Sequence, residues 1–525
     1  MAEQPSDTTK NPEVDFLPRS RRASTLWSLF FSYANSVLVL VRNLALVPLY
    51  LHYIETAEYG AWLATGGVLG YLMVVDFGLM GVLSQQAAVA YGAKDSARLQ
   101  GLLGTGLTIA AALCGLVMVL GVVVSPFVPM MFHLKGEMAG RLALCFLIVA
   151  LANGLSLLGF ATSGVLQSLQ RSFVPGLLNV VAEVCSLSVT VVLLFQGWGL
   201  YAIAWGLAVR STVAVLGNFS RFLWVFRVQM GLRLKWVAAD AKSLFRLCTY
   251  QFATRAAGQL LYGTDPFLVG VIVGPVAAAM YTLSIRAADT VRLFAGQFSG
   301  SLMPGMAHLH GEGDLKQLKS ITVMALMVQT MLVAVGMGCV LAFNHDFVGL
   351  WIGSSNYAGE AVTVLISLAG IGALIGGVAY NIVYAMGGLP SLTRVTWLEV
   401  LVKMPLLIVL VYVVGLWGAA TASLVSTTCV ANVFIFTLLL RNLKFQRPEM
   451  RDLACTLGRI LLPPILLAVA ARILLPPTRS WRVFAIEAIS YGVVALASMA
   501  LAERRLFSIV RQLWIRRGGY LKASN

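Results

Sequence analysis

The chain has 525 residues, of which 59% are hydrophobic and only 11% are charged, and its formal net charge is +16. Soluble proteins carry about 25% charged residues, so this composition excludes an ordinary soluble domain. Nucleic acid is not an expected partner despite the positive charge, because the basic residues gather in short segments between apolar runs, where membrane topology places them.

The predicted elements are membrane-spanning helices. Apolar runs recur from Leu26 to Leu501, and each is long enough to cross the ~30 Å hydrocarbon layer as a helix. Strand-type alternation is absent, so we expect an all-α polytopic membrane protein and not a barrel. In chain order, the fourteen expected spans cover 26–51, 59–83, 99–124, 142–166, 175–196, 200–226, 246–272, 277–303, 318–343, 361–387, 394–414, 418–440, 456–475 and 482–502.

Loop charges orient these spans. Segments on the side of the termini are rich in Lys and Arg, as in 227–245 and 441–451, whereas the opposite connections 52–58, 197–199, 273–276 and 415–417 contain none. Basic loops stay in the cytoplasm, so both termini are predicted to be cytoplasmic. Residues 1–25 are predicted to be a disordered cytoplasmic tail, and residues 503–525 a basic cytoplasmic tail.

The loops leave little room for catalysis. They are too short to hold a soluble catalytic domain, and no G-x-x-x-x-G-K-[ST] loop indicates ATP hydrolysis. The seven cysteines are scattered without metal-type or redox spacing. We therefore expect neither an enzyme nor a bound metal or cofactor, apart from a coupling H⁺ or Na⁺, a choice that the sequence leaves open.

An internal repeat divides the chain. LVPLYLHYIETAEYGAW (46–62) and DPFLVGVIVGPVAAAMY (265–281) share a proline within one span, a short turn, and an aromatic residue early in the next span. Transporters often contain such repeated halves. The predicted parts are an N-lobe (26–226), a basic cytoplasmic linker (227–245), a C-lobe (246–440) and an extra helix pair (441–502).

The stretch VPLYLHYIETAEYGAWLATGGVLGYLMVVDFGLMGVLSQQAAVAYGAKD resembles the N-terminal signature of polysaccharide flippases of the multidrug/oligosaccharidyl-lipid/polysaccharide (MOP) exporter superfamily. The features that match are a proline-containing first helix, an acidic-Tyr-Gly turn, the ending Asp76–Leu79 of the second helix, and the polar loop to Asp95. Fourteen spans resemble the lipid II flippase branch and some exopolysaccharide exporters, in which an extra C-terminal pair borders a groove for a lipid tail.

This resemblance implies two pseudo-symmetric six-helix lobes around a central cavity, which opens alternately to each side of the membrane. It implies transport of an undecaprenyl-diphosphate-linked oligosaccharide across the bacterial inner membrane for exopolysaccharide, O-antigen or capsule assembly. The expected partners are this lipid-linked glycan, membrane lipids, and a polysaccharide polymerase with its chain-length proteins.

Charged residues inside the spans predict the site. Charges at membrane depth are costly and usually face a cavity or a partner. Arginine binds phosphate oxygens through a planar fork that stays charged when buried, and a diphosphate needs several such donors. The diphosphate ligands are therefore predicted to be Arg42, Arg255, Arg286 and Arg292, and the counter-ions or coupling-ion ligands Asp76, Asp265 and Asp289. In the two-lobe arrangement, their spans line the cavity.

Other interpretations remain open. Arg286, Asp289 and Arg292 also fit a structural network that holds helices together. Glu399 and Lys403 are interpreted as an i,i+4 pair at the membrane surface, and Glu183 as a lone acid that is neutral or faces a cavity. The competing functions are a cation-coupled small-molecule antiporter of the same superfamily, in which an acid would govern the first-lobe site, a lipid II flippase, and a scaffold of a synthesis complex.

Overall fold

The fold is helical throughout the part of the chain that the structure describes. The computed structural model describes residues 21–503, and this range contains no strand. The all-α polytopic class is therefore confirmed. Residues 1–20 and 504–525, which hold most of the predicted tails, lie outside the described residues. Residues 21–25 already belong to helix α1 (Arg21–Tyr53), so the prediction of a disordered tail reaching residue 25 is wrong.

The spans differ from the prediction mainly where charges or bends interrupt them. Within the described residues, eleven helices are long and apolar enough to cross a membrane. A twelfth span results if α2 (Thr56–Val74) and α3 (Leu79–Gly92), bent by 42°, count as one. The two further predicted spans coincide with α9 (Ala238–Ile272) and with the consecutive helices α10 (Pro275–Ser284) and α11 (Arg286–Ser301). These helices carry the predicted site charges, which lower their mean hydropathy. Hydropathy alone therefore does not identify them as spans.

The chain forms two compact units. The N-terminal unit comprises Met1–Glu58 and Val68–Gln259, and the C-terminal unit comprises Tyr59–Gly67 and Leu260–Asn525. Helices α2 and α9 therefore contribute to both units. In the C-terminal unit, the lack of a side chain at Gly67 lets α2 lie directly against the backbone carbonyl of Gly263 in α9.

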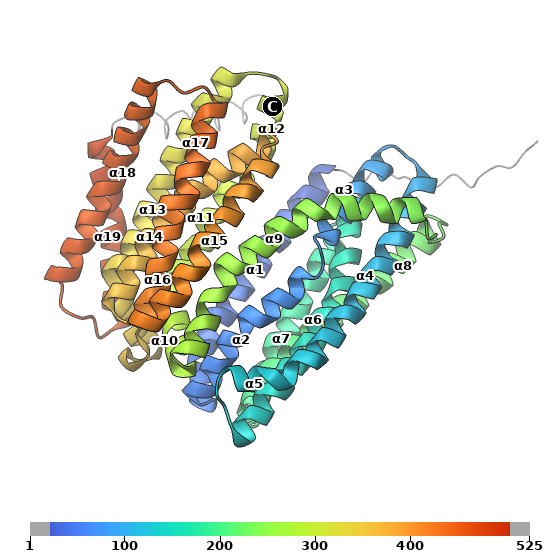
Figure 1. The fold of residues 1–525 in the computed structure, drawn as a ribbon, viewed down its shortest axis with the longest axis horizontal. Helices are drawn as coiled ribbons and strands as arrows, with labels where there is room; N and C mark the ends of the chain where they lie inside the picture. The colour runs from blue at the N-terminus through green and yellow to red at the C-terminus, as the bar shows by residue number, and fades with distance from the viewer. Residues whose placement is uncertain (1–20, 504–525) are drawn as a thin grey trace, which may run out of the picture. The chain divides into compact units, whose positions relative to one another are not determined.

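The N-terminal unit is a helical bundle in which several of the closest packing partners are separated in the sequence. Helix α7 packs on both α1 and α8, and α6 packs on α4 and α8 (Figure 1). This packing brings the middle of α1 beside the middle of α7 and α8. Besides α1 and α3, the helices are α4 (Ser96–Val124), α5 (Val128–Met131), α6 (Gly136–Ser168), α7 (Phe173–Phe195) and α8 (Leu200–Leu223).

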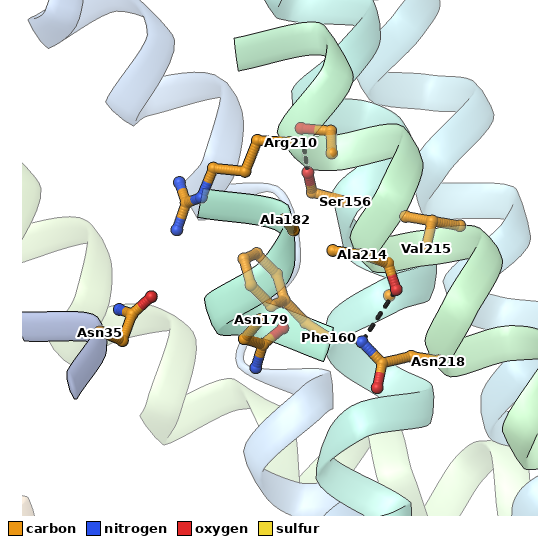
Figure 2. A pocket seen from close by; sticks show the side chains of 11 residues that line it. Asn35, Ser156, Phe160, Asn179, Ala182, Arg210, Ala214, Val215 and Asn218 are labelled. Atoms are coloured by element: carbon orange, nitrogen blue, oxygen red, sulfur yellow. Dashed lines mark hydrogen bonds between the residues drawn. The ribbon is translucent and has the colours of Figure 1, made fainter. Parts of the chain in front are cut away.

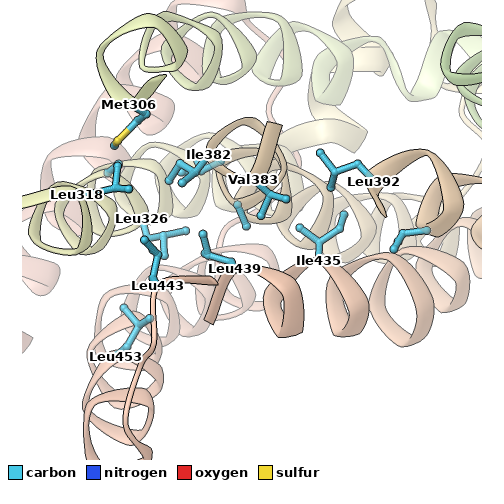
Figure 3. Close-up of a cluster of buried hydrophobic side chains, with 14 of the residues drawn as sticks. Met306, Leu318, Leu326, Ile382, Val383, Leu392, Ile435, Leu439, Leu443 and Leu453 are labelled. Atoms are coloured by element: carbon cyan, nitrogen blue, oxygen red, sulfur yellow. The ribbon is translucent and has the colours of Figure 1, made fainter. Parts of the chain in front are cut away.

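The C-terminal unit has its core among helices that follow α11. A cluster of buried side chains joins α12, α13, α14, α15, α17 and α18, with Ile382 and Leu439 in its middle and Leu318 at one edge (Figure 3). Besides α10 and α11, the helices are α12 (Met303–Gly311), α13 (Leu315–Ile352), α14 (Glu360–Ala385), α15 (Leu389–Val414), α16 (Leu416–Val425), α17 (Val433–Asn442), α18 (Arg447–Leu474) and α19 (Trp481–Ala502).

The last two helices, the predicted extra pair, pack on α13. Both α18 and α19 contact this helix, and α19 also contacts α18 (Figure 1). The Tyr491 hydroxyl of α19 donates a hydrogen bond of 3.0 Å to the Pro464 carbonyl oxygen of α18. The pair is thus an integral part of the C-terminal unit.

The segment before α9 is held on α4. Residues 231–237, inside the predicted linker, have no regular secondary structure. The Thr105 hydroxyl accepts a hydrogen bond of 2.9 Å from the Val237 N–H, and the backbone of Lys235 lies against Gly104. A side chain at position 104 would occupy the same space as that backbone, so glycine is required there.

We expect Gly104→Ala to destabilise the protein, because the added methyl group overlaps the Lys235 backbone, and overpacking of this kind costs about 1–3 kcal/mol. The matched control is Gly115→Ala in the same helix, where the methyl group meets open space and helix propensity favours alanine. Thermal unfolding of the purified protein in detergent measures both. Equal melting temperatures for the two variants would contradict the proposed packing of the linker.

Candidate functional site

The first charged cluster lies inside the N-terminal unit. Glu183 of α7 is fully buried and forms two ion pairs, one to Arg42 of α1 at 2.9 Å and one to Arg210 of α8 at 2.7 Å. Two guanidinium groups share one carboxylate, so the cluster carries one excess positive charge. Both arginines remain partly exposed, and an excess cation at membrane depth favours an anionic ligand.

A polar pocket adjoins this cluster. It has a volume of about 160 Å³, and Arg210 lines one part of it. Figure 2 shows Arg210 and Ser156 in its upper part and the amides of Asn179 and Asn218 lower down. The pocket draws its lining from α1, α6, α7 and α8: Asn35, Ser156, Gly159, Phe160, Asn179, Ala182, Arg210, Ser211, Ala214, Val215 and Asn218.

Asp76 and Arg255 form a second pair in the N-terminal unit. Asp76 lies at the bend between α2 and α3, where it accepts a hydrogen bond of 2.8 Å from the Gly78 N–H. Its other carboxylate oxygen lies 2.6 Å from the Arg255 guanidinium of α9. The predicted single span 59–83 is thus interrupted at Asp76, because Phe77 and Gly78 adopt left-handed backbone conformations that a continuous helix does not contain.

The C-terminal unit encloses a larger charged cavity of about 420 Å³. Helices α9, α10, α11, α14, α15 and α16 contribute to its wall. Five charged side chains line it: Asp265, Asp289, Arg292, Glu399 and Lys403. Three carboxylates therefore face two cations, so this cavity, unlike the N-terminal cluster, has no cationic excess.

The strongest contacts of this cavity centre on Asp265. The Lys403 ammonium lies 2.8 Å from its carboxylate and also donates to the Leu261 carbonyl oxygen, while the Ser423 hydroxyl donates at 2.9 Å. The side chains of Lys403 and Glu399 are buried and Lys403 pairs with Asp265, so their interpretation as an i,i+4 pair at the membrane surface is wrong. Among the described residues, Glu399 accepts only a long hydrogen bond, 3.4 Å, from the Thr427 hydroxyl.

Only two of the three charged residues of α11 line this cavity. The helix path breaks at Ile285, and Arg286 is the first residue of α11. Asp289 pairs with Arg292 at 2.9 Å, and both line the cavity, whereas Arg286 does not. The structure thus joins two of the three evenly spaced charges in one site.

The opposite face of α11 borders an apolar groove. The groove has a volume of about 370 Å³, and α13 and α19 form its other walls. Thr290, Val291, Phe294 and Ala295 line it from α11, and Met331, Leu332, Val335, Gly336 and Leu496 complete it. Asp289 and Arg292 point to one side of the same helix and these residues to the other, as the 3.6-residue period requires.

The structure groups the predicted site residues into separate sets. Asp265, Asp289 and Arg292 share one cavity, Asp76 joins Arg255, and Arg42 belongs to a cluster of its own. The sequence had not assigned Arg210 or Lys403 to a site, it had left Glu183 without a partner, and it had paired Glu399 only with Lys403. Arg210 lies in the apolar run 200–226, so the reasoning that selected Arg42 could also have selected it.

Comparisons with known proteins support the expected resemblance. Residues 174–358 match the profile of a family described as polysaccharide biosynthesis protein. No curated protein sequence matches the chain. The structure is similar to the lipid II flippase MurJ in an inward closed conformation, with a TM-score of 0.69 and 14% identity over 91% of this chain and 100% of that one.

Two transporters of the MOP superfamily also share the fold. An inward-facing multidrug resistance MATE family transporter has a TM-score of 0.64 and 13% identity, over 79% of this chain and 96% of that one. A Pyrococcus furiosus MOP transporter, whose binding pocket is described as having reverse polarity, has a TM-score of 0.59 and 12% identity, over 82% and 98%. The chain therefore has the fold that these transporters share, and the family match over residues 174–358 supports the expected resemblance to a polysaccharide biosynthesis family.

We expect Lys403→Met and Asp265→Asn to destabilise the protein singly, because removal of one partner leaves a buried group unpaired. Breaking a buried ion pair costs about 3–5 kcal/mol, whereas the double substitution removes both charges and should cost less than the sum. Thermal unfolding of the four proteins in detergent gives the coupling. Strictly additive effects would show that the two groups do not interact.

Proposed function

We propose that this chain, a multi-pass membrane transporter of the MOP superfamily and of the polysaccharide-flippase type, moves an undecaprenyl-diphosphate-linked oligosaccharide across the bacterial inner membrane by alternating access. Its termini lie in the cytoplasm. The translocated glycan then serves exopolysaccharide, O-antigen or capsule assembly by a polymerase and its chain-length proteins. The family match over residues 174–358 supports a role in polysaccharide biosynthesis.

The excess positive charge around Glu183 carries this proposal. A cation-coupled drug antiporter would need an acidic first-lobe site, but here two arginines surround the single buried carboxylate. Guanidinium groups bind phosphate oxygens through paired N–H donors. Arg42 and Arg210 are therefore assigned to the diphosphate. Arg255 is tied to Asp76 and Arg292 to Asp289, so these arginines are less available than the sequence suggested.

The groove beside α11 fits the other end of such a substrate. Its lining is apolar, and it borders the charged cavity only through α11. An amphiphile with a long isoprenoid chain needs an apolar path next to a polar one. We assign the groove to the isoprenoid tail, which gives α19 of the extra helix pair a direct role, since Leu496 forms part of the wall.

The C-terminal cavity is assigned to energy coupling. Asp265 is neutralised by Lys403 and Asp289 by Arg292, while Glu399 forms no ion pair within the described residues. A buried carboxylate without a cation favours uptake of a proton or Na⁺. Glu399 thus joins Asp265 and Asp289 as a coupling-ion candidate.

Arg42→Gln should strongly reduce glycan export without loss of the protein from the membrane. The substitution removes the excess charge but leaves Glu183 paired with Arg210, so the fold is retained. Loss of a charge-assisted hydrogen bond costs about 1.5–3 kcal/mol, so export should fall about tenfold or more. Exported polysaccharide is measured in a strain that lacks the native gene, with membrane abundance checked by immunoblot.

The control for this experiment is Arg451→Gln, because Arg451 lies exposed on α18 and lines neither the cavity nor the pocket. Arg42→Lys, which keeps the charge, should retain part of the export. If the Arg42→Gln variant is present in the membrane at normal abundance and exports glycan normally, the assignment of the diphosphate to this cluster is contradicted. Efflux of a cationic dye by the wild-type protein would instead favour the antiporter.

Leu332→Trp should reduce export by filling the groove. Leu332 is part of the groove wall and is 40% exposed, so the larger indole can be placed without displacing the core. Leu462→Trp is the matched control, since Leu462 is an exposed leucine on α18 outside the groove. Accumulation of the lipid-linked glycan in the cytoplasmic leaflet is the readout, and equal export by both tryptophan variants would show that the tail does not use the groove.

A further inference from the structure

The polar pocket of the N-terminal unit has a role beyond charge recognition. We infer that it binds the sugar directly attached to the diphosphate, so that pocket and arginines together recognise a glycosyl phosphate. This inference rests on the proposed function, because it takes the phosphate to lie at Arg42 and Arg210. It adds a sugar-specificity site and names the side chains that form it.

The residues of the pocket and the charged cluster occur in two layers along the same three helices. Asn35 precedes Arg42 by seven residues, Asn179 precedes Glu183 by four, and Asn218 follows Arg210 by eight. Since α1 and α7 run in one direction and α8 in the other, these spacings place the three amides one to two helical turns from the charges, on the same side. Arg210 belongs to both layers, because its side chain also lines the pocket.

The size of the pocket fits one sugar ring. Its volume of about 160 Å³ is well below the about 420 Å³ of the charged cavity in the C-terminal unit, so it suits one sugar ring better than an oligosaccharide. The pocket can therefore read the first sugar, while the rest of the glycan lies outside it.

The hydrogen-bonding capacity of the lining is largely unused. Asn218 is only 1% exposed, and its amide nitrogen donates to the Ala214 carbonyl oxygen at 2.8 Å (Figure 2). Its Oδ1 atom is buried and accepts no hydrogen bond from the described residues. An unsatisfied buried carbonyl is destabilising, and a sugar hydroxyl or an N-acetyl N–H supplies the missing donor.

The other polar side chains of the lining also keep hydrogen-bonding capacity. The hydroxyls of Ser156 and Ser211 lie 2.8 Å apart at the wall, and each keeps further capacity to accept a hydrogen bond. The amides of Asn35 and Asn179 come from two different helices. Amides and hydroxyls are the groups that pair with the many donors and acceptors of a sugar ring, whereas an apolar drug would leave them unpaired.

Thermal-shift measurements on the purified full-length protein test the inference with three kinds of probe: inorganic phosphate, glucose, and a glycosyl phosphate (α-glucose 1-phosphate or α-galactose 1-phosphate). A ligand that binds the folded state raises the melting temperature. In the wild type, at least one glycosyl phosphate should stabilise clearly more than phosphate or the free sugar at equal concentration.

Two variants separate the sugar from the phosphate. Asn218→Leu should reduce the effect of the glycosyl phosphate to that of phosphate alone, because the cluster stays intact. Arg210→Gln should remove the effects of both. Asn179→Leu serves as a second sugar variant if Asn218→Leu does not fold, and Asn442→Leu, at an exposed position on α17, should behave as the wild type.

The inference is overturned if neither glycosyl phosphate exceeds phosphate in the wild type, or if the extra stabilisation persists in both asparagine variants. In that case the proposed function still stands, provided that export depends on Arg42. Stabilisation by phosphate that is insensitive to Arg210→Gln places the anion elsewhere and contradicts both the inference and the assignment of the diphosphate.

Discussion

The structure depends on the cost of a charge in a low-dielectric membrane. The four carboxylates Asp76, Glu183, Asp265 and Asp289 each have a cationic partner, and all of these contacts except that of Asp289 join distant parts of the chain. Glu183 connects α1, α7 and α8 through two arginines, and Asp265 connects α9 to α15 through Lys403. Because an unpaired buried charge is strongly destabilising, these contacts fix which helices pack and which faces meet.

The positive and negative charges do not balance in either cluster, and the sign of the excess differs between the two. The cluster around Glu183 keeps one positive charge too many, and the cavity around Asp265 has one carboxylate more than its cations. The proposed function assigns an anionic headgroup to the first place and a coupling cation to the second. Under that proposal, the substrate and the ion bias the same conformational equilibrium through different contacts.

Helix α11 separates the charged cavity from the apolar groove. Its two faces border spaces of opposite character, the charged cavity at Asp289 and Arg292 and the groove at Val291 and Phe294. The sequence contains this division, because the charged and apolar positions follow the helical period. It does not contain the groove itself, which exists only because α13 and α19 pack beside α11.

The helices could be predicted because the thickness of the bilayer sets their length and apolarity. The bend at Asp76 could not, since it depends on the left-handed conformations of Phe77 and Gly78. Ion pairs between residues far apart in the chain could not be predicted for a similar reason. Spacing suggested Glu399 as the partner of Lys403, but its partner is Asp265, 138 residues earlier in the chain. Spacing within one helix reports local neighbours only, and partners on other helices follow from tertiary packing.

The most direct test of the central claim is a flipping assay with purified protein in proteoliposomes. A fluorescent undecaprenyl-diphosphate-linked oligosaccharide is placed in one leaflet, and its arrival in the other is followed with a membrane-impermeant quencher. If the positive charge around Glu183 recognises the diphosphate, the wild-type protein flips this lipid and excess inorganic diphosphate competes. Absence of flipping, or flipping at an unchanged rate with excess diphosphate present, would contradict the account.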